Sequence, residues 1–351
     1  MEKYYTRACN FYYGSNSKKK ISQKISLPLN GNSLISFDSI ELITRKSKRI
    51  ININKINKLP RNIKKKVFLD LKNIIKKKIF SKLKFGKVPI LMGVLNATPD
   101  SFSDGGKFLN NKSANKQVKK LLNEGAIIID LGGESTRPGA EEIDSKEEWK
   151  RIKLKLSNLS KRKCIISLDT RKSFIIKKSL PYKVSLINDV SGLSHDKDTI
   201  EVLKKSKIPF VIHHMRGTSK NMQTNPSYKN VLLDIYDFFE EKLKLIRKKN
   251  IKHNNIILDP GIGFGKNLKH NITLINKISI FHSLGFPIML GLSRKKFIKD
   301  LTGVNDSKER IGGTISSCIY SSLQGVQILR VHDVNEVNQA LKVFEKLQLN
   351  Q

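Results

Sequence analysis

The chain has 351 residues, of which 38% are hydrophobic, and it carries a formal net charge of +37 at pH 7. This length suits one large domain with an extension, and no apolar run approaches the ~18–20 residues that a transmembrane helix needs. The first fifteen residues contain no apolar signal-peptide core, and the three cysteines match no zinc-binding spacing. We therefore expect a cytoplasmic protein in a reducing compartment, without a membrane partner.

The excess of positive charge has two interpretations. A strongly basic domain is one signature of a nucleic-acid-binding protein. In this chain, however, lysine is scattered along the outer faces of the predicted helices, and asparagine and isoleucine are abundant as well. That pattern favours a compositional drift of the whole sequence, so we expect no nucleic-acid partner.

Residues 1–85 differ in composition from the rest of the chain. They hold 22 Lys and Arg against 4 Asp and Glu, whereas the remaining 266 residues hold 45 against 26. Residues 35–43 (ISFDSIELI) predict one or two short strands, and residues 59–83 carry an apolar stripe at helical spacing beside a lysine-rich face. We interpret residues 1–85 as a basic, partly ordered N-terminal extension of unknown role.

Residues 86–351 alternate between short apolar runs and helix-like segments. Runs of four to eight Val, Ile and Leu suit strands that are buried on both faces, as in a parallel sheet. Eight such strands with helices between them predict an α/β protein of the (β/α)8 class, a TIM barrel, whose chemistry lies at the C-terminal strand ends. Each run ends at or beside a polar residue: Asn96, Asp130, Asp169, Asn188, His214, Asp259, Ser293 and His332.

Two loops that follow these runs have compositions suited to ligand binding. Residues 96–106 (NATPDSFSDGG) are long, polar and glycine-containing, so this loop could order over a ligand. Residues 132–139 (GGESTRPG) contain Thr136 and Arg137, a hydroxyl and a cationic fork that suit phosphate or carboxylate. Residues 261–266 (GIGFGK) have close glycines, but their spacing fits neither a phosphate-binding P-loop nor a dinucleotide fingerprint.

Eight motifs together resemble the dihydropteroate synthase family. In chain order they are NATPDSFSDGG, IIIDLGGESTRPGA, SLDT, INDVSG, HHMRG, LDPGIGFGKN, GLSRK and ILRVHD, and they cover about residues 89–344. The resemblance implies a TIM barrel that is usually dimeric. It also implies a transferase that joins 6-hydroxymethyl-7,8-dihydropterin diphosphate to p-aminobenzoate, with release of diphosphate, in folate biosynthesis.

The resemblance implies a pterin pocket at the inner strand ends. Asp169, Asn188 and Asp259 match the positions that bind the donor-rich edge of the pterin, and Lys295 matches the lysine that donates to its oxygen and ring nitrogen. Met215 matches a position that packs on the ring. Carboxylate and amide oxygens can accept from such an edge in pairs, so these roles are chemically reasonable.

The same resemblance implies a diphosphate site. Asn96 matches the position linked to Mg²⁺, and Arg330 and His332 match the phosphate binders. Mg²⁺ takes few protein ligands and completes its shell with phosphate and water, so one amide is sufficient. Asp130 matches an acidic position beneath the site, where it acts either as a structural hydrogen-bond acceptor or as a ligand contact.

Loss of diphosphate leaves positive charge on the pterin methylene carbon, so catalysis depends on electrostatics and positioning rather than on a nucleophile–base pair. We therefore predict Asp104, Arg137 and Lys295 as the catalytic residues, with Asp104 on the first loop, which closes over the intermediate in the family. The p-aminobenzoate pocket is expected to use Thr136, Arg137, Pro138 and Phe264. One departure is Lys296, which stands where many relatives have a serine that contacts the benzoate carboxylate.

Three alternatives remain at this stage. Another pterin-binding barrel, such as the methyltetrahydrofolate domain of a corrinoid methyltransferase, would share the pterin-binding residues but would not need the STRPGA, SRK and RVHD motifs. A nucleic-acid-binding protein on an inactive barrel would explain the charge but not the intact polar strand ends. His213 and His214 could bind a metal, although packing or hydrogen bonding is the favoured interpretation.

Overall fold

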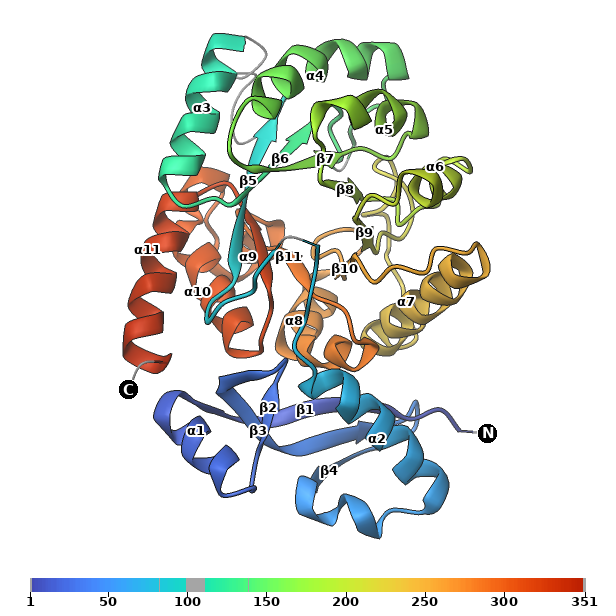
Figure 1. Ribbon diagram of the computed structural model, residues 1–351, viewed down its shortest axis with the longest axis vertical. Coiled ribbons are helices and arrows are strands. Elements are labelled where there is room, and N and C mark those ends of the chain that lie inside the picture. The colour runs from blue at the N-terminus through green and yellow to red at the C-terminus, as the bar shows by residue number, and fades with distance from the viewer. Residues whose placement is uncertain (1, 82, 99–110, 138, 350–351) are drawn as a thin grey trace.

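The computed structural model describes residues 2–81, 83–98, 111–137 and 139–349. Its larger part is a parallel barrel in the strand order β10-β9-β8-β7-β6-β5-β12-β11 (Figure 1). The barrel closes where the Leu258 N–H donates to the Pro287 carbonyl at 2.9 Å and Leu258 forms a parallel bridge with Ile288. The predicted TIM barrel is therefore confirmed. Its strands are β5 (Ile90–Asn96), β6 (Ile128–Gly132), β7 (Ile165–Asp169), β8 (Leu186–Asp189), β9 (Phe210–His213), β10 (Ile256–Asp259), β11 (Met289–Gly291) and β12 (Ile328–Val331).

Helices follow each of these strands and surround the barrel (Figure 1). The α-helices are α3 (Asn111–Asn123), α4 (Ser145–Ser160), α5 (Ser173–Ser179), α6 (Thr199–Ser206), α7 (Val231–Lys248), α8 (Leu268–Asn276), α9 (Lys296–Thr302), α10 (Ile311–Leu323) and α11 (Val334–Phe344). Short 3-10 and π turns are η2 (Leu180–Tyr182), η3 (Ile278–Leu284), η4 (Ser307–Glu309) and η5 (Glu345–Leu349). In the part of the chain that the structure covers, no helix is both long and apolar enough to cross a bilayer.

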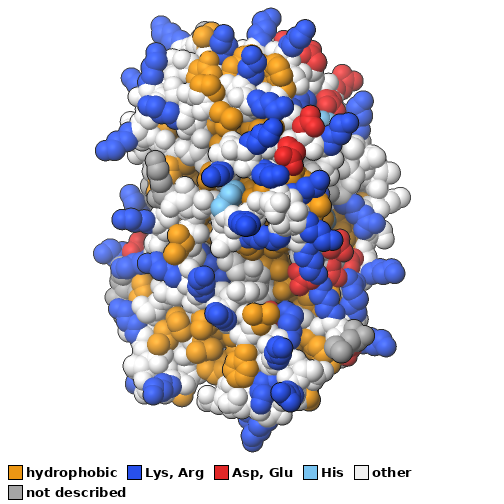
Figure 2. Space-filling model, turned by 45° about the vertical axis from the view of Figure 1, so that its right-hand side comes forward, with side chains coloured by type: hydrophobic (Ala, Val, Ile, Leu, Met, Phe, Trp, Pro, Cys, Tyr) orange, Lys and Arg blue, Asp and Glu red, His pale blue; other side chains and the backbone are white. Residues whose placement is uncertain are grey.

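The surface is basic over both parts of the molecule. Figure 2 shows Lys and Arg side chains scattered across the whole visible face, with Asp and Glu in a few smaller groups. On that face the basic side chains form no single stripe or groove. The distribution matches the interpretation of the charge as a property of the whole sequence.

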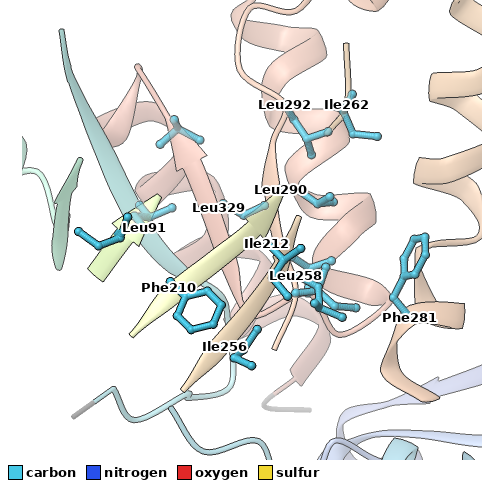
Figure 3. Packing of buried hydrophobic residues seen from close by; sticks show 14 of the residues in the cluster. Leu91, Phe210, Ile212, Ile256, Leu258, Ile262, Phe281, Leu290, Leu292 and Leu329 are labelled. Carbon is cyan, nitrogen blue, oxygen red and sulfur yellow. The ribbon is translucent and has the colours of Figure 1, made fainter. Parts of the chain in front are cut away.

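Side chains alternate across each barrel strand and divide the core in two. One set packs outward against the helices, including Leu91, Ile212, Leu258 and Leu329 (Figure 3). Its neighbours along the same strands, including Met92, form an inner cluster at the N-terminal end of the barrel. Because the period is two, every second residue beyond the inner cluster also faces the barrel interior, and these positions include the polar residues at the C-terminal strand ends.

Residues 5–75 form a second, smaller unit below the barrel (Figure 1). Strand β3 is central and is paired antiparallel with β1 along one edge and with β2 and β4 along the other. The segment predicted as one or two short strands is a single twelve-residue strand, and the predicted helix ends at Ile75. The elements are β1 (Tyr5–Tyr13), α1 (Gly14–Ser22), β2 (Leu27–Leu29), β3 (Asn32–Ile43), β4 (Lys48–Asn52), η1 (Ile53–Lys58) and α2 (Arg61–Ile75).

Ion pairs fasten this unit to the barrel helices. The Asp237 carboxylate of α7 forms ion pairs with the Lys3 Nζ at 2.5 Å and with the Arg45 Nη2 at 2.6 Å. It also accepts a hydrogen bond from the Tyr5 hydroxyl at 2.9 Å. Glu41 of β3 accepts from Lys277, just before η3, at 2.7 Å. These contacts join segments more than 180 residues apart, so the N-terminal unit covers the lower face of the barrel.

Phe80 and Leu83 close the N-terminal end of the barrel. Both are buried, and they pack with the inward residues at the start of the strands, among them Ile128 and Met289. The hydrophobic core of the barrel therefore includes side chains that precede residue 86.

We expect Phe80→Ala to lower the free energy of unfolding by about 3–5 kcal/mol, because it leaves a cavity inside the barrel. Ile79 is the matched control, since its side chain is 70% exposed and Ile79→Ala should change stability by less than about 0.5 kcal/mol. Urea unfolding followed by circular dichroism measures both. Equal effects of the two substitutions would contradict the assignment of Phe80 to the barrel core.

Candidate active site

The predicted site residues lie on the inward rows of neighbouring strands. The register pairs Asn96 with Gly132, Gly132 with Asp169, and Asp169 with Asn188. On the other side of the barrel, Arg330 pairs with Gly291. These residues therefore stand at a similar height around the C-terminal mouth.

Asp130 lies just below this mouth and is fully buried. It accepts from the Ser167 hydroxyl at 2.5 Å, from the Asn188 Nδ2 at 3.1 Å and from the Arg330 Nε at 2.7 Å. Three donors from three different strands thus meet on one carboxylate. Of the two roles left open for Asp130, the contacts favour a hydrogen-bonding role that orients Asn188 and Arg330.

Arg330 connects Asp130 to Asp169. Its Nη2 donates to Asp169 Oδ2 at 2.9 Å, so the guanidinium is held between two carboxylates. Burial raises the pKa of Asp169, and the nearby charge of Asp130 raises it further, while Arg330 opposes both effects. The other oxygen of Asp169, Oδ1, and the Asn188 Oδ1 are buried and accept no hydrogen bond within the described residues.

Asp259 and Lys295 face the same cavity from the opposite side. Asp259 ends β10 and accepts from the Gly261 N–H at 2.8 Å, and burial raises its pKa to about 6. The Lys295 ammonium lies 4.3 Å from the centre of the Phe264 ring, a cation–π contact that orients it. Burial and then the charge of Arg330 lower the pKa of Lys295 to about 8.

These side chains line one narrow cavity at the barrel mouth. Six predicted residues are part of its wall: Thr136, Asn188, Asp259, Phe264, Lys295 and Arg330. Val190, His213, Ile262 and Gly291 complete it. The structure thus brings together three of the residues expected to bind the pterin, Asn188, Asp259 and Lys295, with two of those expected to bind p-aminobenzoate, Thr136 and Phe264.

The other predicted residues lie around the cavity or outside the described chain. Asp169 is behind Arg330, Asn96 ends β5, and Met215 is half-buried in the loop after β9. Asp104 and Pro138 lie outside the described residues.

His332 follows β12, and cations surround it. Burial is the first cause that lowers its pKa well below the ordinary value, and the charges of Arg330, Arg294, Lys295 and Arg137 lower it further. Its imidazole is therefore neutral at pH 7 and can donate one N–H. The positive field at this side of the mouth comes from the arginines and Lys295.

Glu134 fastens the loop that carries Thr136 and Arg137. It accepts from the Ile143 N–H at 3.0 Å, from the Arg171 Nε at 3.1 Å and from the Lys172 Nζ at 3.1 Å. The Lys172 Nζ also donates to the Ile143 carbonyl at 2.5 Å, so both ends of the loop meet at one ion cluster.

The sequence motifs alone did not single out these three charged residues, Glu134, Arg171 and Lys172. Their signal was present, because Glu134 lies inside GGESTRPGA and the two basic residues follow Asp169 directly. Burial opposes ionisation of Glu134, but Arg171 holds the pKa of the carboxyl below its usual range.

Strand β9 ends one residue earlier than the sequence indicated. His213, not His214, faces the barrel and lines the cavity; its Nδ1 donates to the Val190 carbonyl at 2.9 Å and its ring packs against Phe264. His214 points the other way and accepts at Nδ1 from the buried Lys266 Nζ at 3.0 Å. Alternation from the apolar Val211 would have identified His213 as the inward residue.

Lys296 lies on the outer face of α9. Its side chain is 74% exposed and pairs with Asp300 at 2.9 Å, one turn along the helix. It therefore faces solvent rather than the cavity. Two residues before Lys296, the Arg294 N–H donates to the Thr314 hydroxyl at 3.0 Å.

Within the described residues, no group of three or more His, Cys, Asp and Glu could hold a metal ion by itself. Asn96 offers one amide at the mouth, beside Gly132. This donor set does not fit a metal bound only by protein. It does fit a Mg²⁺ ion whose other ligands are phosphate oxygens and water.

Comparisons with known proteins agree with this geometry. A family model described as "Pterin binding enzyme" matches residues 92–332. The dihydropteroate synthase of Escherichia coli K12 is 39% identical over 258 residues, which cover 73% of this chain and 91% of that protein. The Yersinia pestis dihydropteroate synthase, solved with a sulfonamide drug, has a TM-score of 0.72 and 37% identity and covers 76% of this chain and 95% of its own. The Clostridium difficile dihydropteroate synthase, solved in the presence of pteroic acid, has a TM-score of 0.69 and 38% identity. The match covers 76% of this chain and 98% of that one.

The barrel and its polar mouth define a pterin-binding enzyme. The matches cover most of each relative, with identities near 40%. The chain therefore belongs to the dihydropteroate synthase family, and the resemblance found in its motifs is confirmed.

Proposed function

We propose that this mouth catalyses the reaction of the family, the transfer of the 7,8-dihydropterin-6-ylmethyl group from its diphosphate ester to the amine of p-aminobenzoate. The observation that carries the proposal is the set of Asn188, Asp259, Lys295 and Arg330 around one cavity, with Asp169 hydrogen-bonded to Arg330. Support from ligands comes from the Clostridium difficile relative, which was solved in the presence of pteroic acid. Pteroic acid contains both halves of the proposed product.

The unpaired acceptors at the mouth suit a pterin. Asp169 Oδ1 and Asn188 Oδ1 accept no hydrogen bond from the described protein, and buried polar atoms of this kind normally have a partner. The guanidine-like edge of a pterin supplies several N–H donors in one plane. Asp259 would accept from the same ring, and Lys295 would donate to its oxygen and ring nitrogen.

The reaction exchanges one bond for another. The bond between the pterin methylene carbon and the bridging oxygen breaks, and its electron pair leaves with diphosphate. The aniline nitrogen forms the new bond to that carbon and then loses a proton. Arg330 and Arg137 would stabilise the leaving anion, and the neutral imidazole of His332 would donate to it.

Mg²⁺ would enter this site together with the diphosphate. Asn96 would supply the protein ligand, and phosphate oxygens and water the others. The bound ion would neutralise part of the charge that develops on the leaving diphosphate.

The p-aminobenzoate would lie between Phe264 and the loop held by Glu134. Phe264 and Thr136 both line the cavity wall, and Arg137 follows Thr136 on the loop. A planar ring can stack on Phe264 while its carboxylate meets a cationic or N–H donor. We further propose a cytoplasmic location and small molecules, rather than nucleic acid, as the partners.

The deciding experiment is product formation from 6-hydroxymethyl-7,8-dihydropterin diphosphate and p-aminobenzoate with Mg²⁺, followed by chromatography. Turnover that needs both substrates and stops on removal of Mg²⁺ is the expected result. A folded protein that binds the pterin but forms no dihydropteroate would refute the synthase and leave another pterin-binding activity.

The pH dependence follows from Asp259 and Lys295. Asp259 is ionised above a pKa of about 6, and Lys295 is charged below a pKa of about 8. We expect kcat/KM to fall as the pH drops through about 6 and again as it rises through about 8. Binding of 6-hydroxymethyl-7,8-dihydropterin, which lacks phosphates, over the same range separates these limbs from titration of the substrate's phosphates. A flat profile from pH 5 to 9 would contradict both assignments.

We also propose a homodimer. An apolar groove between α10 and α11 is lined by Ile315, Ile319, Val343 and Leu347, and the last two are 58% and 62% exposed. A second copy is the occupant that the family resemblance implies. Light scattering of the full chain should give twice 40.0 kDa; a constant mass of one chain at micromolar concentration would count against a dimer.

A further inference from the structure

A second cavity, of about 330 Å³, lies between the N-terminal unit and the lower end of the barrel. Its wall comes from the turn between β2 and β3, from the residues after α2, from the segment that leads into β5 and from the residues before β12. It is at the opposite end of the barrel from the polar mouth. A volume of this size can hold a small molecule or several waters.

Lys78 is the buried charge in this wall. Its side chain is 5% exposed, and its Nζ donates to the Asn73 carbonyl at 2.6 Å and to the His282 carbonyl at 3.4 Å. An ammonium has three donors, so these two neutral acceptors leave one N–H. No carboxylate within the described residues forms an ion pair with Lys78. Burial therefore lowers the pKa of Lys78 to about 7.

The rest of the wall is also positive. Lys77 and Lys87 line the cavity with Lys78, and the described lining contains no Asp or Glu. Lys87 pairs with Glu345 at 3.6 Å, and such a partly exposed ion pair contributes little to stability. In the sequence, no acidic residue occurs between Asp70 and Asp100. The cavity therefore favours an anion.

Asn30 adds an acceptor to the same wall. It is in the left-handed region, with φ of 54°, in the tight turn before β3. Its Nδ2 donates to the Gly325 carbonyl at 3.1 Å, which directs the amide across the junction. The Asn30 Oδ1 is buried and accepts no hydrogen bond from the described residues. A ligand that carries a donor as well as negative charge would complement this wall.

We propose that this cavity binds a phosphate group. Hydrogen phosphate offers oxygens for Lys77 and Lys78 and one P–OH for the Asn30 Oδ1. A carboxylate would leave the Asn30 oxygen without a donor. The group could come from inorganic phosphate or from diphosphate, and in either case it would bridge the N-terminal unit and the barrel.

Calorimetric titration of the full chain with inorganic phosphate, and separately with diphosphate, tests this site. The Arg330→Met variant weakens the proposed phosphate site at the barrel mouth by removing one of its cations, so the part of the remaining binding that Lys78 controls reports the lower cavity. In that background, Lys78→Met should weaken phosphate binding at least about tenfold, the loss expected for one charge-assisted hydrogen bond. Tighter binding of diphosphate than of phosphate would identify the product of the proposed reaction as the source.

Charge reversal at the rim provides a test that does not disturb the interior. Lys77 and Lys84 are both exposed, but only Lys77 lines the cavity. Lys77→Glu should weaken phosphate binding at least about tenfold, while Lys84→Glu should change it less than twofold. If Lys78→Met does not fold, the comparison of Lys77→Glu with Lys84→Glu tests whether the cavity binds phosphate. Absence of binding in a folded Arg330→Met protein, or equal effects of the two reversals, would overturn the proposal.

Discussion

Asp259→Asn is expected to reduce kcat/KM for the dihydropterin substrate by about 10²- to 10³-fold, and Lys295→Met by a similar factor. Each substitution removes a charge that faces the cavity and would contact the pterin. Loss of one preorganised electrostatic contact in an enclosed site costs about this much. Initial rates at saturating p-aminobenzoate, with the diphosphate ester varied, measure the effect.

Lys296→Met is the matched control for Lys295→Met. Lys296 is the next residue in the chain, but its side chain is exposed and pairs with Asp300 outside the cavity. We expect less than a twofold change in kcat/KM. Equal losses in the two lysine variants would mean that general positive charge, rather than the contact of Lys295 with the pterin, controls the rate.

The double variant should lose less than the product of the two single losses. Asp259 and Lys295 face one cavity, and each charge shifts the pKa of the other. Residues that bind one ring as a unit give strongly non-additive effects. Full additivity would instead place the two groups on separate steps.

The barrel could be predicted because its signal is local. Each strand is a short apolar run with a polar end, and the fold itself brings those ends to one mouth. The same argument fails by one residue at β9. Two consecutive histidines end that run, and only the alternation from Val211 shows that His213 faces inward.

The N-terminal unit could not be predicted in the same way. Its sheet pairs Tyr5 with Ile43, and its attachment to the barrel joins Arg45 to Asp237. Such contacts between distant segments leave no periodic pattern in the sequence. Charge composition alone identified the segment but not the lysine-lined cavity that it forms with the barrel.

The contacts of Arg330 with two carboxylates could not be predicted from the sequence either. Its motif matches a phosphate binder, yet the side chain lies between Asp130 and Asp169. Those two carboxylates are on β6 and β7, and only the pairing of β12 with β5 brings them to Arg330. One residue therefore connects the pterin side of the mouth with the proposed diphosphate side.

Glu134→Gln is expected to raise KM for p-aminobenzoate by about tenfold and to change KM for the dihydropterin substrate by less than threefold. Glutamine preserves the shape of the side chain but removes the charge that Arg171 and Lys172 share. The loop with Thr136 and Arg137 would then lose much of its positioning. Varying each substrate at saturating levels of the other separates the two constants.

Stability provides the second measurement of the same cluster. Glu134→Ala leaves two buried cations with fewer partners, and removal of one member of a buried ion pair costs about 3–5 kcal/mol. We expect a loss of stability at the lower end of this range. Lys172 would still form an ion pair with Glu148 at 3.0 Å, and Arg171 would still form one with Glu142 at 3.4 Å. Glu147→Gln is the control, since Glu147 forms a partly exposed pair with Arg151 one helical turn away and such pairs contribute about 0.3–0.5 kcal/mol. A purely structural cluster would lower stability in Glu134→Ala without raising KM for p-aminobenzoate in Glu134→Gln, so the two variants together distinguish positioning of the loop from support of the fold.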